Sequence, residues 1–251
     1  MKRLLLLLLL ACVPMWMASP ATAATRFFLP ASTAADVNPA FDAGWETNGS
    51  ALRKALADSK GASALMGTGA EVIALTEDSL NEALNRQLVS RPMNSGIVFT
   101  SGVTSVSMQL MVREGAVTDN VDRGLLGIRV VSLDGSTERA TLLAVSNYST
   151  TSEFTNNTSF RNKTFADGDT ITAGYTTVEG DRLVVEVGYQ TSTGSSSTPN
   201  AQANWGENST DLPVNESQTT AGNGWIEFSN TITFCATCAS AAPRRKPIVI
   251  D

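Results

Sequence analysis

The chain has 251 residues, of which 42% are hydrophobic and 17% charged, enough apolar material for a globular core. A net charge of −6 argues against nucleic-acid binding, because neutralising phosphates needs clustered Lys and Arg. The sequence has no histidine, which excludes Ser-His-Asp and Cys-His catalysis and zinc sites that need imidazole.

The first 23 residues have the pattern of a signal peptide. Two basic residues precede an apolar run over residues 4–10, and residues 21–23 (Ala-Thr-Ala) form a small-residue cleavage site. The apolar run is too short for a membrane span, so we expect export, cleavage after residue 23 and no membrane association of the mature chain. The alternative is lipoprotein processing at Cys12, which ends a lipobox-like stretch.

The next segments combine one strand with two candidate helices. Residues 26–29 form a first short strand. Residues 50–60 place leucines four positions apart, a spacing that fits a helix or a strand equally well. Residues 76–88 begin with N-cap and acidic residues and continue with leucines at four-residue spacing, including Leu84 and Leu88. This pattern predicts one short helix or helical turn, with an extended conformation of residues 86–91 as the alternative.

From residue 96 onward the hydrophobic pattern has a period of two, which is typical of strands. Residues 105–113 alternate apolar and polar side chains. Residues 124–133 and 139–146 are separated by Asp134 and Gly135, a turn sequence that predicts a hairpin. The side chains expected to face the core are Val106, Met108, Leu110, Val112, Leu126, Ile128 and Val130.

A second hairpin is expected from residues 170–178 and 182–190, because Gly-Asp pairs flank the first of these segments. The last strand is expected over residues 225–234. The side chains predicted to face the core in these strands are Leu183, Val185, Val187, Tyr189, Ile226, Phe228, Ile232 and Phe234.

This succession of about eight or nine strands predicts an all-β fold. We expect an antiparallel β-sandwich of jelly-roll or Greek-key type with at most one or two short helices. A single domain is expected over residues 24–234, followed by a flexible C-terminal tail, residues 235–251, that contains the CxxC motif.

Two glutamates are the candidates for chemistry. Glu186 and Glu227 each lie mid-strand, on the face opposite the apolar side chains. If their strands were neighbours, both carboxylates could face one cleft, as in jelly-roll glycoside hydrolases. The simpler interpretation is that both are solvent-facing charges that keep an outer sheet face wet.

Aromatic residues suggest a sugar-binding surface as a further hypothesis. Trp205 follows a Ser/Thr/Gly-rich segment and is the best candidate for an exposed ligand-binding ring, whereas Trp45 and Tyr189 are assigned to the core. Acidic residues at the ends of the second predicted hairpin, Asp181 among them, fit tight turns better than a calcium site.

Cys235 and Cys238 are the cysteines left after signal cleavage. In an exported protein such a pair is expected to be oxidised, so we predict an intramolecular Cys235–Cys238 disulfide, with a bridge between subunits as the alternative. A complete zinc site would need further ligands, and the sequence offers no histidine and no second cysteine pair, unless two chains share the metal.

Five ordered segments carry a resemblance to a known family: residues 27–30 (FFLP), 38–45 (NPAFDAGW), 129–135 (RVVSLDG), 180–188 (GDRLVVEVG) and 225–229 (WIEFS). Together they resemble a family of uncharacterised, jelly-roll-like β-sandwich proteins from tailed phages and environmental sequences. The resemblance implies a virion or tail-associated component, and it transfers no catalytic residue. The signal peptide and the tail with Cys235 and Cys238 depart from this family, so a secreted bacterial protein, of prophage descent for example, is the competing interpretation.

The expected function is therefore non-enzymatic: a structural or adhesive β-sandwich, secreted, periplasmic or part of a virion. Its expected partners are virion proteins, cell-surface proteins or surface glycans, and a homo-oligomer is compatible with the sequence. No cofactor, catalytic residue or metal is expected. The alternative is a carbohydrate-binding module that uses Trp205, Glu186 and Glu227, and a secreted jelly-roll glycoside hydrolase ranks third.

Overall fold

The structure is a computed structural model that describes residues 23–30, 33–48, 51–58, 69–74, 82–114, 121–149, 154, 160–191, 200–205 and 224–238. These residues form strands, turns and loops without any helix, so none of them builds a helix that would span a membrane. The strands are β1 (Thr25–Phe28), β2 (Leu52–Ala55), β3 (Gly69–Ala74), β4 (Ala83–Val89), β5 (Val98–Phe99), β6 (Ser105–Glu114), β7 (Val121–Val131), β8 (Glu138–Ser149), β9 (Arg161–Thr170), β10 (Tyr175–Thr176), β11 (Arg182–Thr191), β12 (Asn200–Trp205) and β13 (Trp225–Phe228).

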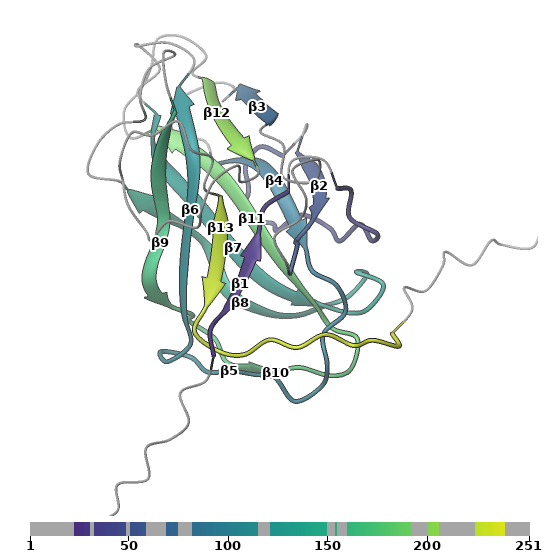
Figure 1. Ribbon diagram of the computed structural model, residues 1–251. Coiled ribbons are helices and arrows are strands. Elements are labelled where there is room, and N and C mark those ends of the chain that lie inside the picture. The colour runs from purple at the N-terminus through teal and green to yellow at the C-terminus, as the bar shows by residue number, and fades with distance from the viewer. Residues whose placement is uncertain are drawn as a thin grey trace, which may run out of the picture.

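Two sheets face each other in a sandwich (Figure 1). The first sheet has the order β1-β13-β6-β9, and β12 and β3 continue it along the other half of β6. The second sheet has the order β2-β4-β11-β7-β8. Apart from the parallel edge pair β2–β4, neighbouring strands run antiparallel. The four-strand orders β1-β13-β6-β9 and β4-β11-β7-β8 are those of a jelly roll, which confirms the predicted fold class.

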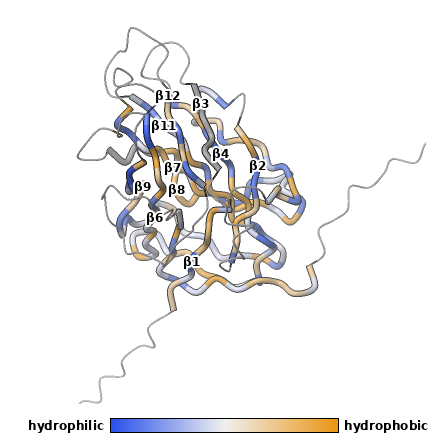
Figure 2. Tube along the Cα trace, turned by 45° about the horizontal axis from the view of Figure 1, so that its top comes forward, coloured by the Kyte–Doolittle hydropathy of each residue, from blue (hydrophilic) through white to orange (hydrophobic). Residues whose placement is uncertain are grey.

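The core lies between the two sheets. The predicted core-facing side chains of residues 105–113, 124–133 and 182–190 are all buried there, now on β6, β7 and β11. Figure 2 shows hydrophobic and hydrophilic stretches following one another along the strands. Burial of each Val, Leu or Ile side chain stabilises the fold by about 1.5–3 kcal/mol. The alternation of apolar and polar side chains is therefore the main reason why the two sheets pack face to face.

The predicted helix over residues 76–88 is wrong in its described part, because residues 83–89 form β4. Leu84 pairs with Gly188 and Arg86 pairs with Val187, which leaves Asn85 as an extra residue, a β-bulge. The bulge reverses the strand's phase, so Leu88 enters the main core and Leu84 packs on the outer face. Four-residue leucine spacing therefore arises here in a bulged strand. The ambiguous segment 50–60 contains β2.

The predicted second hairpin is also wrong. Gly168 has a positive φ of 76° and lies inside β9, where the register with β6 shifts, so the Gly-Asp pair at 168–169 marks a bulge and no turn. Thr170 is the last residue of β9, and residues 171–178 contribute only the short β10, which pairs with β5 at one end of the sandwich. The partners of β11 are β4 and β7. The last strand ends at Phe228, earlier than predicted, although Ile232 is still buried.

Residues 33–48 cover the outer face of the second sheet. Val37 packs against Val89, Val131 and Val184 in a small apolar cluster outside the main core. The buried Arg182 fixes the same part of the segment, since its guanidinium forms two hydrogen bonds of 2.9 and 2.8 Å with Asp36. The outer face of β4, β7 and β11 is therefore buried under residues 33–48, and the layer between them forms a second interior of the protein.

Candidate functional site

Glu186 lies at the centre of this second interior. Its neighbours on β11, Val185 and Val187, point into the main core, so strand alternation turns Glu186 to the outer face, as predicted. The expected exposure to solvent is not observed, because residues 33–48 cover the carboxylate and leave Glu186 only 1% exposed. A charge in such a place needs compensation from hydrogen-bond donors.

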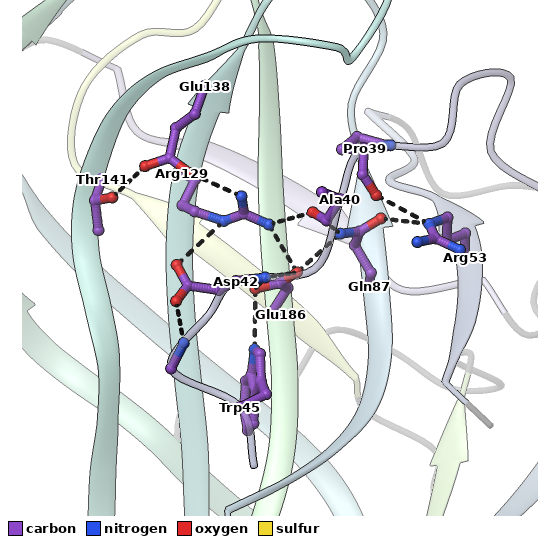
Figure 3. A network of polar contacts seen from close by, with 11 residues as sticks. Pro39, Ala40, Asp42, Trp45, Arg53, Gln87, Arg129, Glu138, Thr141 and Glu186 are labelled. Carbon is purple, nitrogen blue, oxygen red and sulfur yellow. Dashed lines mark hydrogen bonds and ion pairs between the residues drawn. The ribbon is translucent and has the colours of Figure 1, made fainter. Parts of the chain in front are cut away.

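Four N–H groups supply that compensation (Figure 3). Oε1 of Glu186 accepts hydrogen bonds of 2.8 Å from Gln87 Nε2 and 2.8 Å from Arg129 Nη2. Oε2 accepts a 3.0 Å hydrogen bond from Trp45 Nε1. The backbone N–H of Asp42 lies 3.2 and 3.3 Å from the two oxygens. The donors come from β4, β7 and the covering segment, so the carboxylate joins three parts of the fold.

Arg129 is the cationic partner and is itself almost fully buried. Besides Glu186 it contacts Glu138 at 2.9 Å, Asp42 at 3.4 Å and the carbonyl oxygen of Ala40 at 2.8 Å. Burial acts to lower the pKa of Arg129, but the charge of Glu186 and the contacts with Glu138 and Asp42 outweigh it, so the pKa is raised. The guanidinium stays charged throughout the physiological range.

The cluster of Asp42, Gln87, Arg129, Glu138 and Glu186, called here the Glu186 cluster, holds the covering segment in place. Gln87 Nε2 also lies within 3.2 Å of the Ala40 carbonyl oxygen. Arg53 Nε donates to Gln87 Oε1 at 3.0 Å and to the Pro39 carbonyl oxygen at 3.1 Å. Two successive carbonyl groups of the segment are thus bound by side chains of the sheet.

A depression of about 260 Å³ lies beside the cluster. It is lined by Pro39, Ala40, Phe41, Asp42, Ala43, Arg129, Val131, Gly135, Ser136 and Glu138. Asp42 accepts from the Gly44 N–H at 2.7 Å, and Glu138 accepts from Thr141 Oγ1 at 2.6 Å. A carboxylate has about four acceptor positions, so each of these two side chains keeps acceptor capacity for a further donor.

The two candidate glutamates do not share a cleft. Glu227 lies on β13 in the first sheet and accepts a 3.0 Å hydrogen bond from Arg26 on β1. Glu186 lies on the outer face of the other sheet. Because stacked sheets are about 10 Å apart and both side chains point away from the core, their separation exceeds the spacing of glycosidase carboxyl pairs. The structure gives the predicted pair no support.

Trp205 is not an exposed platform, which corrects the sequence interpretation. Its side chain is fully buried at the end of β12, where the Arg86 guanidinium lies 4.0 Å from the ring centroid. Ala201 and Ala203 on the same strand are also buried in the core. Trp45 and Tyr189 are buried, as predicted, although Trp45 belongs to the outer cluster with Leu84 and Leu125.

Asp181 is part of a buried turn. It accepts hydrogen bonds from Tyr175 Oη at 2.7 Å and from the Val178 N–H at 2.9 Å, and Arg139 lies 3.6 Å away. Burial, followed by the hydrogen bond to Asp181 and its charge, raises the pKa of Tyr175 to about 12. These contacts use the carboxylate as a structural acceptor, in line with the turn interpretation.

The structure contains the predicted disulfide between Cys235 and Cys238, whose Cα atoms are 5.5 Å apart. Residues 235–238 are in the described part of the chain, where the Cys235 N–H donates to the Pro92 carbonyl oxygen at 2.9 Å. The predicted signal peptide, apart from Ala23, and residues 239–251 lie outside the described residues.

Sequence reasoning did not find Asp42, Gln87 or Arg129. A usable signal was present, because Arg129 and Glu186 carry opposite charges and each is flanked on both sides by apolar residues in its strand. Residues 37–45 show no strand or helix period but contain the aromatic residues Phe41 and Trp45. Such a segment is expected to pack its aromatic side chains against another part of the protein.

Fold and site together define a jelly-roll protein in which the ion pair between Glu186 and Arg129 is buried. A scan against models of protein families gives no match, and a search of curated proteins gives none either. Among solved structures, a CocE/NonD family hydrolase from Staphylococcus aureus is similar with a TM-score of 0.43 and 9% identity over 83% of this chain and 36% of its own.

Two other solved structures show the same level of similarity or less. An α-amino acid ester hydrolase has a TM-score of 0.43 and 10% identity, covering 72% of this chain and 34% of its own. The structure of infectious bursal disease virus, Gt strain, has a TM-score of 0.27 and 11% identity, covering 82% and 41%. This chain spans less than half the length of each of these three proteins. Likeness at this level assigns no activity.

Proposed function

We propose that the protein is a non-enzymatic structural or adhesive jelly-roll protein that acts through its surface, either secreted or as part of a virion or phage tail. The observation that supports this proposal is that the Glu186 carboxylate is buried and its hydrogen-bond acceptors are occupied by groups of the protein itself. A general acid, base or nucleophile must reach its substrate. Glu186 is 1% exposed and accepts hydrogen bonds from four N–H groups.

The Glu186 cluster has a mechanical role in this proposal. It fixes residues 39–45 on the second sheet through Gln87, Arg129 and Arg53, so the outer surface is presented in one conformation. A surface that is ordered before binding loses less conformational entropy when a partner is bound. A covered sheet face of this kind suits contact with another virion protein, a cell-surface protein or a glycan.

A second candidate function, carbohydrate binding, is favoured by the depression beside the cluster. Phe41 and Pro39 contribute apolar surface to its lining, and Asp42, Glu138 and Ser136 contribute hydrogen-bond acceptors. Sugars combine hydroxyl donors with apolar C–H faces, and aromatic and polar groups together recognise both. This location replaces Trp205 as the proposed sugar-binding position.

Binding of the labelled mature chain to cell envelopes and phage particles of the source organism tests the proposal. Ala43 is exposed, lines the depression and makes no side-chain hydrogen bond, so Ala43→Arg fills the depression without breaking the cluster. Thr170→Arg, at an exposed position on β9 of the other sheet, is the matched control. We expect binding by the wild type and the control and a loss of at least about tenfold in Ala43→Arg.

Two outcomes contradict the proposal. The first is turnover of an ester or glycoside substrate by the purified protein that Glu186→Gln abolishes while the fold is retained, because this would make Glu186 catalytic. The second is absence of both envelope and particle binding. A glycan array separates the two candidates: glycan hits that disappear in Ala43→Arg support sugar recognition, and envelope binding without glycan hits supports a protein partner.

A further inference from the structure

Glu179 lies beside the Cys235–Cys238 pair. Its Oε1 atom is 3.5 Å from Cys238 Sγ, and one carboxylate oxygen and the two sulfur atoms all lie within 4.8 Å of one another. The other carboxylate oxygen accepts a 3.0 Å hydrogen bond from the Ser95 N–H, which fixes the orientation of the side chain. Two sulfur atoms and one carboxylate therefore converge at one place on the surface.

We propose that the reduced form of this pair, together with Glu179, is a three-ligand zinc site with water in the fourth position. Tetrahedral zinc with Zn–S of about 2.3 Å and Zn–O of about 2.0 Å places the sulfur and oxygen ligands about 3.5 Å apart. The distance between Cys238 Sγ and Glu179 Oε1 already has this value. The proposal does not depend on the proposed function.

The backbone around the site supports thiolate ligands. The Cys238 N–H lies 2.9 Å from Cys235 Sγ and points its hydrogen at the sulfur. An N–H donor of this kind favours the charged form of its acceptor, and zinc binds the thiolate. Cys235 is 7% exposed, so the sulfur that receives this hydrogen bond is also shielded from solvent.

Residues 92–95 hold both halves of the site, independently of the disulfide. On one side, the Asn94 N–H donates to the Thr233 carbonyl oxygen at 3.0 Å and the Cys235 N–H to the Pro92 carbonyl oxygen at 2.9 Å. On the other side, the Gly180 N–H donates to the Met93 carbonyl oxygen at 2.9 Å, directly after Glu179. Reduction of the disulfide leaves these contacts in place, so the three ligands remain close together.

The disulfide and the zinc complex are alternative states of the same two sulfurs. A dithiol reductant passes two electrons to the S–S bond, becomes a disulfide itself, and leaves two protonated thiols on the protein. Zinc then displaces both protons and binds the two thiolates. The sequence has no histidine and no second cysteine pair to complete a zinc site, and Glu179 supplies the third ligand from a distant turn.

Metal titration of the reduced full-length mature protein tests this inference. The protein is reduced with a phosphine, desalted without oxygen, and titrated with Co²⁺ and Zn²⁺, while far-ultraviolet circular dichroism monitors the fold. We expect one metal per chain, with a sulfur-to-cobalt charge-transfer band and the visible bands of tetrahedral Co²⁺. The oxidised protein provides the negative control, because its sulfurs are not available.

Glu179→Gln keeps an acceptor for the Ser95 N–H and removes the charged ligand. We expect it to weaken Zn²⁺ binding at least about tenfold, since substitution of residues that only hydrogen-bond to metal ligands already lowers metal affinity 10–100-fold. Glu46→Gln, at an exposed position away from the site, is the matched control and should bind like the wild type.

A Cys235→Ser/Cys238→Ser variant should lose the charge-transfer band. Unchanged affinity in Glu179→Gln, binding no tighter than in the double serine variant, or unfolding on reduction each overturns the inference.

Discussion

The indole N–H of Trp45 donates a 3.0 Å hydrogen bond to the buried carboxylate of Glu186, 141 residues later in the chain. Trp45→Phe keeps most of the ring and removes this donor. A hydrogen bond to a charged group contributes about 1.5–3 kcal/mol, so we expect the free energy of unfolding to fall by that amount in urea titrations. Trp225→Phe is the control, because Nε1 of Trp225 has no hydrogen-bond partner among the described residues. Equal losses in the two variants would show that the bond to Glu186 contributes nothing.

The ion pair between Glu186 and Arg129 gives a second prediction. Glu186→Leu leaves the Arg129 guanidinium buried without its main partner, and breaking a buried pair in this way costs about 3–5 kcal/mol. Adding Arg129→Met removes the unpaired charge, so the double variant should be more stable than the sum of the two single losses implies. Denaturant unfolding of all four proteins measures this coupling. Strictly additive losses would mean that the two side chains act independently.

Gly188 gives a prediction about packing. A Cβ atom built there overlaps the Trp45 ring and the Ala83 carbonyl oxygen, and the backbone atom cannot move aside easily. We expect Gly188→Ala to destabilise the protein by about 1–3 kcal/mol in thermal or urea unfolding. Gly127→Ala on β7 is the control, because its nearest neighbour is a Val145 side-chain atom at 3.2 Å. Its loss should be smaller, and the opposite order would contradict the tight contact between the covering segment and β11.

Phe228 tests the phase of the last strand. Its ring lies edge-on to Phe27 at 6.1 Å and to Phe99 at 6.2 Å, and the side chain is fully buried. Phe228→Ala should cost about 3–5 kcal/mol, whereas Thr231→Ala, at an exposed position, should cost less than about 1 kcal/mol. Chemical unfolding of both variants decides the matter, and similar losses would contradict the assigned faces.

Tyr175 predicts a loss of stability at high pH. Burial, together with the contact to Asp181, raises its pKa from 10.0 to about 12, so the folded protein holds the phenol proton more tightly than the unfolded chain. The resulting contribution is complete below pH 10 and is lost as the pH rises from 10 to about 12. Tyr175→Phe should flatten the fall in unfolding free energy across this interval, measured by urea titration. A fall of unchanged slope would assign the pH dependence to other groups.

The alternation of residues such as Val106, Met108 and Leu110 predicts the strands and their inner faces correctly, because a strand buried on one side needs one apolar face. Alternation does not determine which strand pairs with which. The hairpin expected at residues 170–178 is therefore wrong, and the partner of β11 on one side is β4, a segment predicted to be helical.

The candidate site is only partly predictable, because its chemistry depends on what covers the outer face. Glu186 is correctly placed on that face, but its burial comes from residues 33–48, which have no regular period. Trp205 shows the converse error: its polar neighbours in sequence suggested exposure, whereas Ala201 and Ala203 on the same strand face show that it points into the core. Long-range coverage of this kind is a property of the topology.

The pairing of β1 with β13 has a consequence for how the chain folds during synthesis. Thr25 pairs with Phe228 and Phe28 with Trp225, and the Ile232 N–H donates to Thr25 Oγ1 at 2.7 Å. In the described part of the chain, β13 is the only strand that pairs with β1, and it also forms the link between β1 and β6. A ribosome makes β1 first and β13 last, and contacts between distant segments form slowly. Apart from the backbone bridge between Phe28 and Ala57, the first strand therefore stays unpaired until β13 has been made, and a nascent chain that stops short of residue 225 exposes the edge of β6 that β13 would cover.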